Sequence, residues 1–145
     1  SLSNFDPFFK KKNLPKISNL KKANFNNIDV IFTALPNGES QKIAKELNSN
    51  TKLIDLSADF RLRNVNDYKK WYKIKHKAKK LIKDSLYCIP ELTKNDIRNF
   101  KIIACPGCYP TSIQIPLIPL IKKNLIDVNN IIVDSKSGYS GAGKK

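Results

Sequence analysis

The chain has 145 residues, of which 41% are hydrophobic and 27% are charged, and its formal net charge is +15. This composition excludes a disordered chain, the apolar runs are too short to cross a bilayer, and the lysines are spread along the whole sequence, which favours a solvated surface over a binding stripe. Three cysteines, an odd number, do not fit a secreted disulfide framework and predict a reducing, cytoplasmic location.

The first regular element is expected after a polar N-terminal stretch. Residues 1–27 are rich in Asn and Lys and predict no regular element. Residues 29–35 (DVIFTAL) form a continuous apolar run that ends at Pro36, Asn37 and Gly38. Such a run, followed by turn residues, is typical of a strand that is buried on both faces.

A helix and a second strand follow with short links. Residues 39–48 place Ile43, Ala44 and Leu47 on one helical face, and residues 52–57 (KLIDLS) predict another buried strand. Strand, helix and strand in this order form the βαβ unit of a parallel, doubly wound α/β sheet. In such sheets ligands bind beyond the carboxyl ends of the strands.

The next segment mixes lysines with aromatic residues, namely Tyr68, Trp71 and Tyr72. This mixture is found in proteins that stack single-stranded nucleic acid, which stays open as an alternative. Apolar residues nevertheless recur here every three or four positions, at Trp71, Ile74, Ala78 and Leu81. This spacing predicts one helical stripe that faces the core while the lysines face water, so we expect no nucleic-acid partner.

Two more strands are predicted further along. Residues 101–104 (KIIA) predict a third strand, and the segment that starts at Ile131 (IIVDSKSG) predicts a fourth that ends in a glycine loop. The third strand leads directly into CPGCYPT, residues 105–111. The carboxyl end of the predicted sheet therefore carries two thiols.

Three chemistries are open to these thiols. Cys88, Cys105, Cys108 and His76 are the residue types of a zinc site, but structural zinc sites draw on two compact pairs and this chain has one Cys-x-x-Cys. A dithiol before a helix is typical of thioredoxin-like redox proteins, although their cis-proline loop is not recognisable here. Cys88 is expected to be a structural cysteine.

The third chemistry is a single nucleophile, Cys108. Pro106 and Gly107 form a turn signal before it, and Pro110 marks the first turn of a helix. At a helix N-terminus the backbone N–H groups and the macrodipole stabilise a thiolate. The same N–H groups can hold the oxyanion of an acyl-transfer reaction, so we predict thiol acyl chemistry and no metal.

Five sequence blocks resemble one known family, N-acetyl-gamma-glutamyl-phosphate reductase, which is related to aspartate-semialdehyde dehydrogenase. The blocks are DVIFTALPNGES, LIDLSADFRL, YKKWYKIKH, YCIPEL with IIACPGCYPT, and VDSKSGYSGAGKK. The resemblance implies a cytoplasmic enzyme that reduces an acyl phosphate to an aldehyde with NADPH, releases phosphate and is a homo-oligomer when complete. It also implies an incomplete Rossmann-type sheet in residues 1–107, followed by the start of an α+β catalytic domain in residues 108–145.

The resemblance also implies roles for individual residues. Cys108 would form a thioester with the acyl group, and Arg61 would clamp the substrate's phosphate with its planar fork. Two segments would wrap NADPH: Leu35, Pro36, Asn37 and Gly38, and then Ser137, Gly138, Gly141, Ala142 and Gly143. For Arg61 a surface ion pair, and for residues 35–38 a plain turn, remain alternatives.

The chain departs from the family at several points. It has Cys105 where the family has Asn, and Pro116 is expected to bend the helix near Thr111. The glycine-rich phosphate loop has no counterpart, the family's acid–base histidine would lie beyond Lys145, and His76 is expected to be structural. We therefore expect an internal segment that does not turn over substrate on its own.

Overall fold

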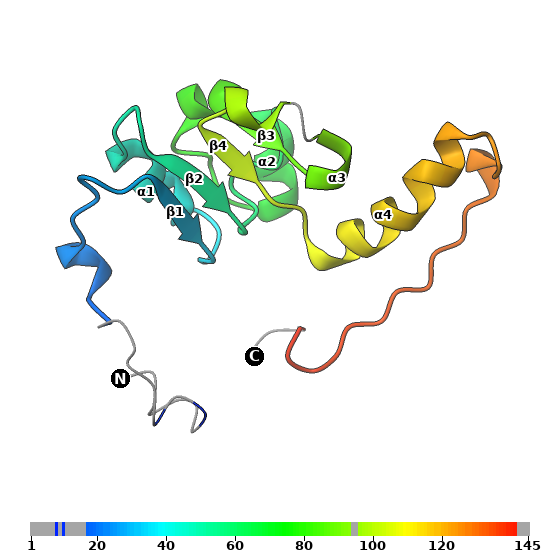
Figure 1. The fold of residues 1–145 in the computed structure, drawn as a ribbon, viewed down its shortest axis with the longest axis horizontal. Coiled ribbons are helices and arrows are strands. Elements are labelled where there is room, and N and C mark those ends of the chain that lie inside the picture. Colours follow the sequence, from blue (N-terminus) through cyan, green and yellow to red (C-terminus); the bar gives the residue numbers. More distant parts are fainter. Residues whose placement is uncertain (1–7, 9, 11–16, 94–95, 142–145) are drawn as a thin grey trace.

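The computed structural model of the chain describes residues 8, 10, 17–93 and 96–141 (Figure 1). Within these residues the strands are β1 (Val30–Thr33), β2 (Lys52–Asp55), β3 (Ser85–Tyr87) and β4 (Ile102–Ala104). The α-helices are α1 (Ser40–Glu46), α2 (Val65–Tyr72), α3 (Pro90–Thr93) and α4 (Cys108–Lys122). Short 3-10 helices are η3 (Leu20–Lys22), η4 (Lys79–Asp84), η5 (Ile97–Asn99) and η6 (Val128–Asn130).

The four strands form one sheet in the order β1-β2-β4-β3, and every neighbouring pair is parallel. The prediction of an α/β fold with a parallel sheet is confirmed, as are the strands expected in residues 29–35, 52–57 and 101–104 and the helix expected in residues 39–48. Leu53 lies at the centre of the sheet, between Ile31 on β1 and Ile102 on β4. Its side chain is fully buried.

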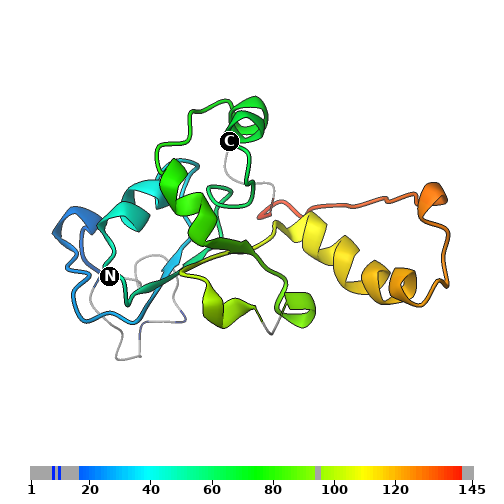
Figure 2. The ribbon, with the colours of Figure 1, turned by 90° about the horizontal axis from the view of Figure 1, so that it is seen from above.

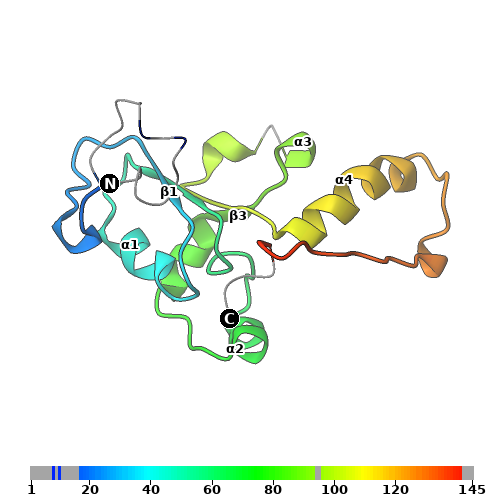
Figure 3. The ribbon, with the colours of Figure 1, turned by 90° about the horizontal axis from the view of Figure 1, so that it is seen from below.

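Helices cover both faces of the sheet. Figures 2 and 3 show α1 and α2 on one side and α3 on the other. The crossover from β2 passes over the first face to reach β3, and the return to β4 runs over the second face. The core joins the apolar face of α1 to the strands, and it contains Ile43, Ala44, Leu47, Leu53, Phe60, Ala78, Ile102 and Ala104.

The helical stripe predicted across residues 71–81 is wrong. Helix α2 ends at Tyr72, because Lys73 takes a left-handed conformation with φ of 60°, and Trp71 is 69% exposed. After Lys73, exposed and buried side chains alternate along the chain. His76 and Ala78 are buried, whereas Lys75, Lys77 and Lys79 are exposed. A period of two is typical of extended backbone, and it explains the repeated Lys-x pattern better than a helix does.

The strand predicted from Ile131 is also wrong. Residues 131–138 form no regular element and run back alongside α4, away from the sheet (Figures 2 and 3). A strand needs a hydrogen-bonded neighbour, and at this distance from the sheet the described residues provide none. Ile132 is consequently 97% exposed.

Helix α4 projects away from the sheet and continues through Pro116 and Pro119 (Figure 1). It is the longest of the described helices, yet none of its side chains is buried. None of the described helices combines the length and the apolar character that a membrane span requires.

Candidate functional site

Cys108 is the first residue of α4, and its side chain is exposed. Strand β4 ends at Ala104, and Gly107 caps the helix; its carbonyl accepts hydrogen bonds from the Thr111 N–H at 3.0 Å and the Thr111 hydroxyl at 2.9 Å. In the described part of the chain, the N–H groups of Cys108 and Tyr109 have no hydrogen-bond partner. The predicted placement at a helix N-terminus is confirmed, and these two donors are free to meet an oxyanion.

Arg61 joins the loop after β2 to the loop after β4. Its Nε donates to the Cys105 carbonyl at 2.8 Å, and its Nη2 donates to the Leu56 carbonyl at 2.9 Å. Among the described residues Nη1 has no hydrogen-bond partner, so the side of the guanidinium that carries Nη1 is its open edge. A Cβ added to Gly107 would lie 3.4 Å from Nη1, which places the open edge next to the residue before Cys108.

The segment 35–38 follows β1 at the same end of the sheet. Gly38 has a φ of +93°, a conformation that favours glycine, and a Cβ there would lie 3.3 Å from Ile74 Cδ1. Pro36 and Asn37 are exposed, and within the described residues the Asn37 side chain makes no hydrogen bond. The alternative of a plain turn is therefore compatible with this backbone, but the turn presents a free amide at the carboxyl end of β1.

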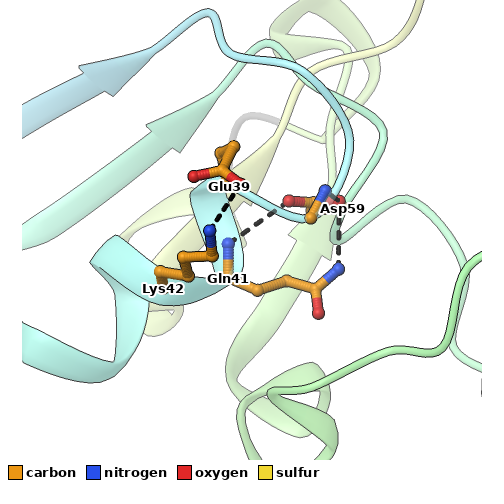
Figure 4. A network of polar contacts seen from close by, with 5 residues as sticks. Glu39, Gln41, Lys42 and Asp59 are labelled. Carbon is orange, nitrogen blue, oxygen red and sulfur yellow. Dashed lines mark hydrogen bonds and ion pairs between the residues drawn. The ribbon is translucent and has the colours of Figure 1, made fainter.

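A buried carboxyl group fixes this turn. Asp59 Oδ1 accepts hydrogen bonds from the Gly38 N–H at 2.7 Å and the Gln41 Nε2 at 3.0 Å, and its Oδ2 accepts from the Gln41 N–H at 3.2 Å (Figure 4). The Tyr68 hydroxyl donates to the same Oδ1 at 2.5 Å. Burial, together with the bond to Asp59, raises the pKa of Tyr68 above its ordinary value. Asp59 precedes Arg61 by two residues, so one loop holds the turn after β1 and carries Arg61.

A second buried carboxyl group, Asp55, closes the carboxyl end of β2. Its Oδ1 accepts from the hydroxyls of Thr33 and Ser40, both at 2.9 Å, and from the Ser57 N–H at 2.9 Å. The sequence patterns did not predict these buried roles for Asp55 and Asp59. The available signal was a carboxylate at the end of a buried strand and a second one four residues later, with Ser57 between them, because a buried carboxyl group needs several donors.

His76 is buried, and both of its ring nitrogens are hydrogen-bonded. Nδ1 accepts from the Ala78 N–H at 3.2 Å, so Nε2 carries the proton and donates to the Asp59 carbonyl at 2.9 Å. Burial lowers the pKa of His76. The predicted structural role is in keeping with these contacts, since the histidine ties residues 76–78 to the Asp59 loop.

The other two cysteines differ from Cys108. Cys88 is buried, and its sulfur lies 2.9 Å from the Thr93 hydroxyl. Cys105 is half-buried, and burial raises the pKa of its thiol. In the described part of the chain, no three His, Cys, Asp or Glu side chains gather closely enough to hold a metal ion.

The backbone does not favour a disulfide between Cys105 and Cys108. Residues 105–107 form no turn, and Gly107 is extended, with φ of −70° and ψ of 164°. An extended Gly107 lengthens the path from Cys105 to Cys108, whereas a disulfide requires Cα atoms within about 7 Å of each other. The dithiol alternative would require this loop to refold.

The second predicted cofactor segment is described only in part. Ser137, Gly138 and Gly141 are exposed, and Ala142 and Gly143 lie outside the described residues. The stretch before them returns along α4 toward Cys108, because Ser135 and Lys136 line the same cavity of about 450 Å³ as Tyr109. Ser137 and Gly138 thus follow a segment that reaches the neighbour of Cys108.

Family comparisons match both parts of the chain. Residues 2–100 match the NAD-binding domain of semialdehyde dehydrogenase, and residues 108–145 match the semialdehyde dehydrogenase dimerisation domain.

Curated relatives of high similarity carry a common name. A protein of Oryza sativa subsp. japonica, named probable chloroplastic N-acetyl-gamma-glutamyl-phosphate reductase, is 51% identical over 133 residues, which are 92% of this chain and 32% of that protein. The Arabidopsis thaliana protein of the same name is 47% identical over 99% of this chain and 36% of its own length. An N-acetyl-gamma-glutamyl-phosphate reductase of Ehrlichia canis is 48% identical over 88% of this chain and 37% of its own length.

The chain spans about a third of the length of these relatives. Its parallel sheet and the match over residues 2–100 agree with each other. The chain therefore belongs to the semialdehyde dehydrogenase family.

Proposed function

We propose that this chain is the nucleophile-bearing part of an N-acetyl-gamma-glutamyl-phosphate reductase. The complete enzyme would reduce N-acetylglutamyl 5-phosphate to N-acetylglutamate 5-semialdehyde with NADPH and release phosphate, in the pathway to arginine. The observation that carries the proposal is the exposed Cys108 at the start of α4, beside the open edge of Arg61. The name shared by the relatives supports the choice of substrate.

In the first step the Cys108 thiolate attacks the carbonyl carbon of the acyl phosphate. The free N–H groups of Cys108 and Tyr109 lie where they can donate to the oxyanion that forms. The bond between the carbonyl carbon and the phosphate oxygen then breaks, phosphate leaves with the electron pair, and a thioester remains on Cys108.

Arg61 is proposed to hold the phosphate as it leaves. Two backbone carbonyls hold Nε and Nη2, which leaves the Nη1 N–H groups and the second N–H of Nη2 to contact the phosphate oxygens. A lysine has no planar fork and cannot serve both purposes at once. The alternative of a surface ion pair has no support, because in the described part of the chain Arg61 contacts no carboxylate.

The residues at the carboxyl ends of the strands fit a nicotinamide cofactor. Pro36 and Asn37 are exposed there, and the Asn37 amide is free to contact a ligand. When bound, the cofactor supplies the hydride that reduces the thioester to the aldehyde. Residues 35–38, Ser137, Gly138, Gly141, Ala142 and Gly143 are proposed to contact it, and NADPH is proposed over NADH on the likeness to the reductases.

We propose a domain boundary at residue 107, supported by the change there from a sheet with its own core to a helix with no buried side chain. A homo-oligomer is supported by the match to a dimerisation domain. The cytoplasm remains the proposed location, although the two plant relatives are named as chloroplastic.

The alternatives gain no support from the geometry. The extended backbone of residues 105–107 disfavours a dithiol. For nucleic acid, Tyr68 is buried and packs against Tyr72 at 5.0 Å between ring centroids, which leaves Trp71 as the one exposed ring of α2. A stacking platform needs several exposed rings.

Acylation of the chain by N-acetylglutamyl phosphate tests the proposal. After an acid quench, intact-mass analysis should find one N-acetylglutamyl group on the wild-type chain and none on Cys108→Ala. Arg61→Lys should acylate about ten- to a hundredfold more slowly, because the bidentate phosphate contact is lost. Peptide mapping that placed the acyl group on Cys88 or Cys105 would refute the assignment of Cys108 as the nucleophile. A steady NADPH-dependent rate from the 145-residue chain would refute the proposal that it is only part of an enzyme.

A further inference from the structure

A second concave site lies apart from Cys108, between α1 and residues 75–81, which lead into η4. The cavity has a volume of about 850 Å³, which is within the range of small-molecule sites. Five lysines line it: Lys45, Lys75, Lys77, Lys79 and Lys80. We call this cavity the lysine pocket.

The charge of the lysine pocket is not neutralised by the protein. Among the described residues no Asp or Glu lines it. In the described part of the chain, the ion pairs are Lys42 with Glu39 and Lys136 with Asp134, so none of the five pocket lysines has one. Lys45 on α1 and Lys79 on η4 come from different elements and line the same pocket. Their positive charges therefore belong to one site.

The accessible floor of the lysine pocket is apolar. It is formed by the half-buried Leu81 and by the lysine stems, since Ala78 and His76 line the pocket but are buried and offer little surface. Lysine stems add to such a floor while their ammonium groups reach the solvent. A ligand that used the whole pocket would combine an aliphatic body with several negative charges.

A nucleic-acid strand fits this pocket poorly. Single strands are held by exposed aromatic rings on which successive bases stack, and no described Trp, Tyr or Phe lines the pocket. His76 lines it but is buried, and Trp71, the exposed ring of α2, is not among the lining residues. A compact ligand accounts for both the concave shape and the lack of an exposed ring.

The lysine pocket is separate from the proposed reductase site. Ser40, at the start of α1, lies at the carboxyl end of β2 through its bond to Asp55, whereas Lys45 lies in the last turn of α1. The other lining residues belong to residues 75–81 and do not contact Cys108 or Arg61.

We propose that the lysine pocket binds a small diphosphate ester with an aliphatic body. The ammonium groups contact the diphosphate, and the apolar floor formed by Leu81 and the lysine stems contacts the body. This binding function is additional to the proposed reductase activity and does not depend on it.

Isothermal titration of the chain with isopentenyl diphosphate and with inorganic pyrophosphate, at physiological ionic strength, tests the proposal. The ester should bind several-fold more tightly than pyrophosphate, because only the ester uses the apolar floor. The double variant Lys77→Gln/Lys79→Gln should bind the ester roughly tenfold more weakly.

A matched control removes the same net charge elsewhere. Lys122→Gln/Lys123→Gln, at the exposed end of α4, should change the affinity by less than about twofold, because distant exposed charges are screened. Equal losses in the two double variants would show that net charge alone attracts the anion, and equal affinity for ester and pyrophosphate would refute a role for the apolar floor. Either result would overturn the proposal, as would an absence of binding. Acylation of Cys108, measured on the same samples, should be unchanged in both variants and reports separately on the reductase proposal.

Discussion

The burial of apolar side chains differs between the residues before Gly107 and those after it. Before it, α1 and the strands bury a core that contains Leu53, Phe60 and Ile102, together with two fully bonded carboxyl groups. After it, none of the described residues 108–141 is buried, although α4 is apolar through most of its length. We call residues 108–141 the arm. The apolar side chains of the sheet are thus covered by helices of the same chain, whereas the described residues leave the apolar side chains of the arm accessible.

Truncation of apolar side chains should separate the two regions most clearly. Leu53→Ala, in the centre of the sheet, should lower the free energy of unfolding by about 3 kcal/mol, because it leaves a cavity in a packed core. Ile132→Ala, in the arm, should change it by less than about 0.5 kcal/mol, because that side chain is 97% exposed. Urea unfolding followed by circular dichroism measures both. Similar losses for the two variants would mean that the arm is packed in solution.

A buried polar group should give the next largest effect. Asp59→Asn replaces one acceptor by a donor, so the N–H groups of Gly38 and Gln41 can no longer both be satisfied, and stability should fall by about 2 kcal/mol. Tyr68→Phe removes one donor to Asp59 but leaves the turn at Gly38 bonded, and it should cost about 1 kcal/mol. If Asp59→Asn unfolded at the same urea concentration as wild type, the carboxyl group would not be what holds this turn.

The smallest effect concerns pH. Burial lowers the pKa of His76 in the folded chain, so the stabilisation is fully present above the ordinary histidine pKa of about 6.5 and is lost as pH falls from there toward the folded value. Stability should therefore decrease between pH 7 and pH 5.5, with a slope of at most about 1.4 kcal/mol per pH unit for one proton. His76 is the only histidine of the chain, so His76→Gln should flatten this dependence. A wild-type curve that is already flat over this range would contradict the burial of a neutral imidazole.

Much of the sheet could be predicted from the sequence because buried parallel strands are continuous apolar runs. DVIFTAL, KLIDLS and KIIA gave β1, β2 and β4, and the proline and glycine around Cys108 gave the start of α4. Strand β3 was missed, since its residues Ser85–Tyr87 are too few and too mixed to show a pattern.

Other features depend on tertiary contacts that a local pattern does not contain. The segment after Tyr72 satisfies both a helical and an alternating pattern, and the left-handed Lys73 decides between them. The strand predicted from Ile131 has the right composition, but the described residues offer no neighbouring strand for it to pair with. The roles of Asp55 and Asp59 depend on donors that come from other elements, such as Thr33, Ser40 and Gln41.

The anchor of Arg61 has a consequence for mutational tolerance. Arg61 donates hydrogen bonds to two main-chain oxygens, that of Cys105 after β4 and that of Leu56 after β2. Main-chain oxygens are the same in every amino acid, so position 105 is free to drift in identity without loosening the guanidinium. The thiol at position 105 is thus a side chain that this anchoring does not require.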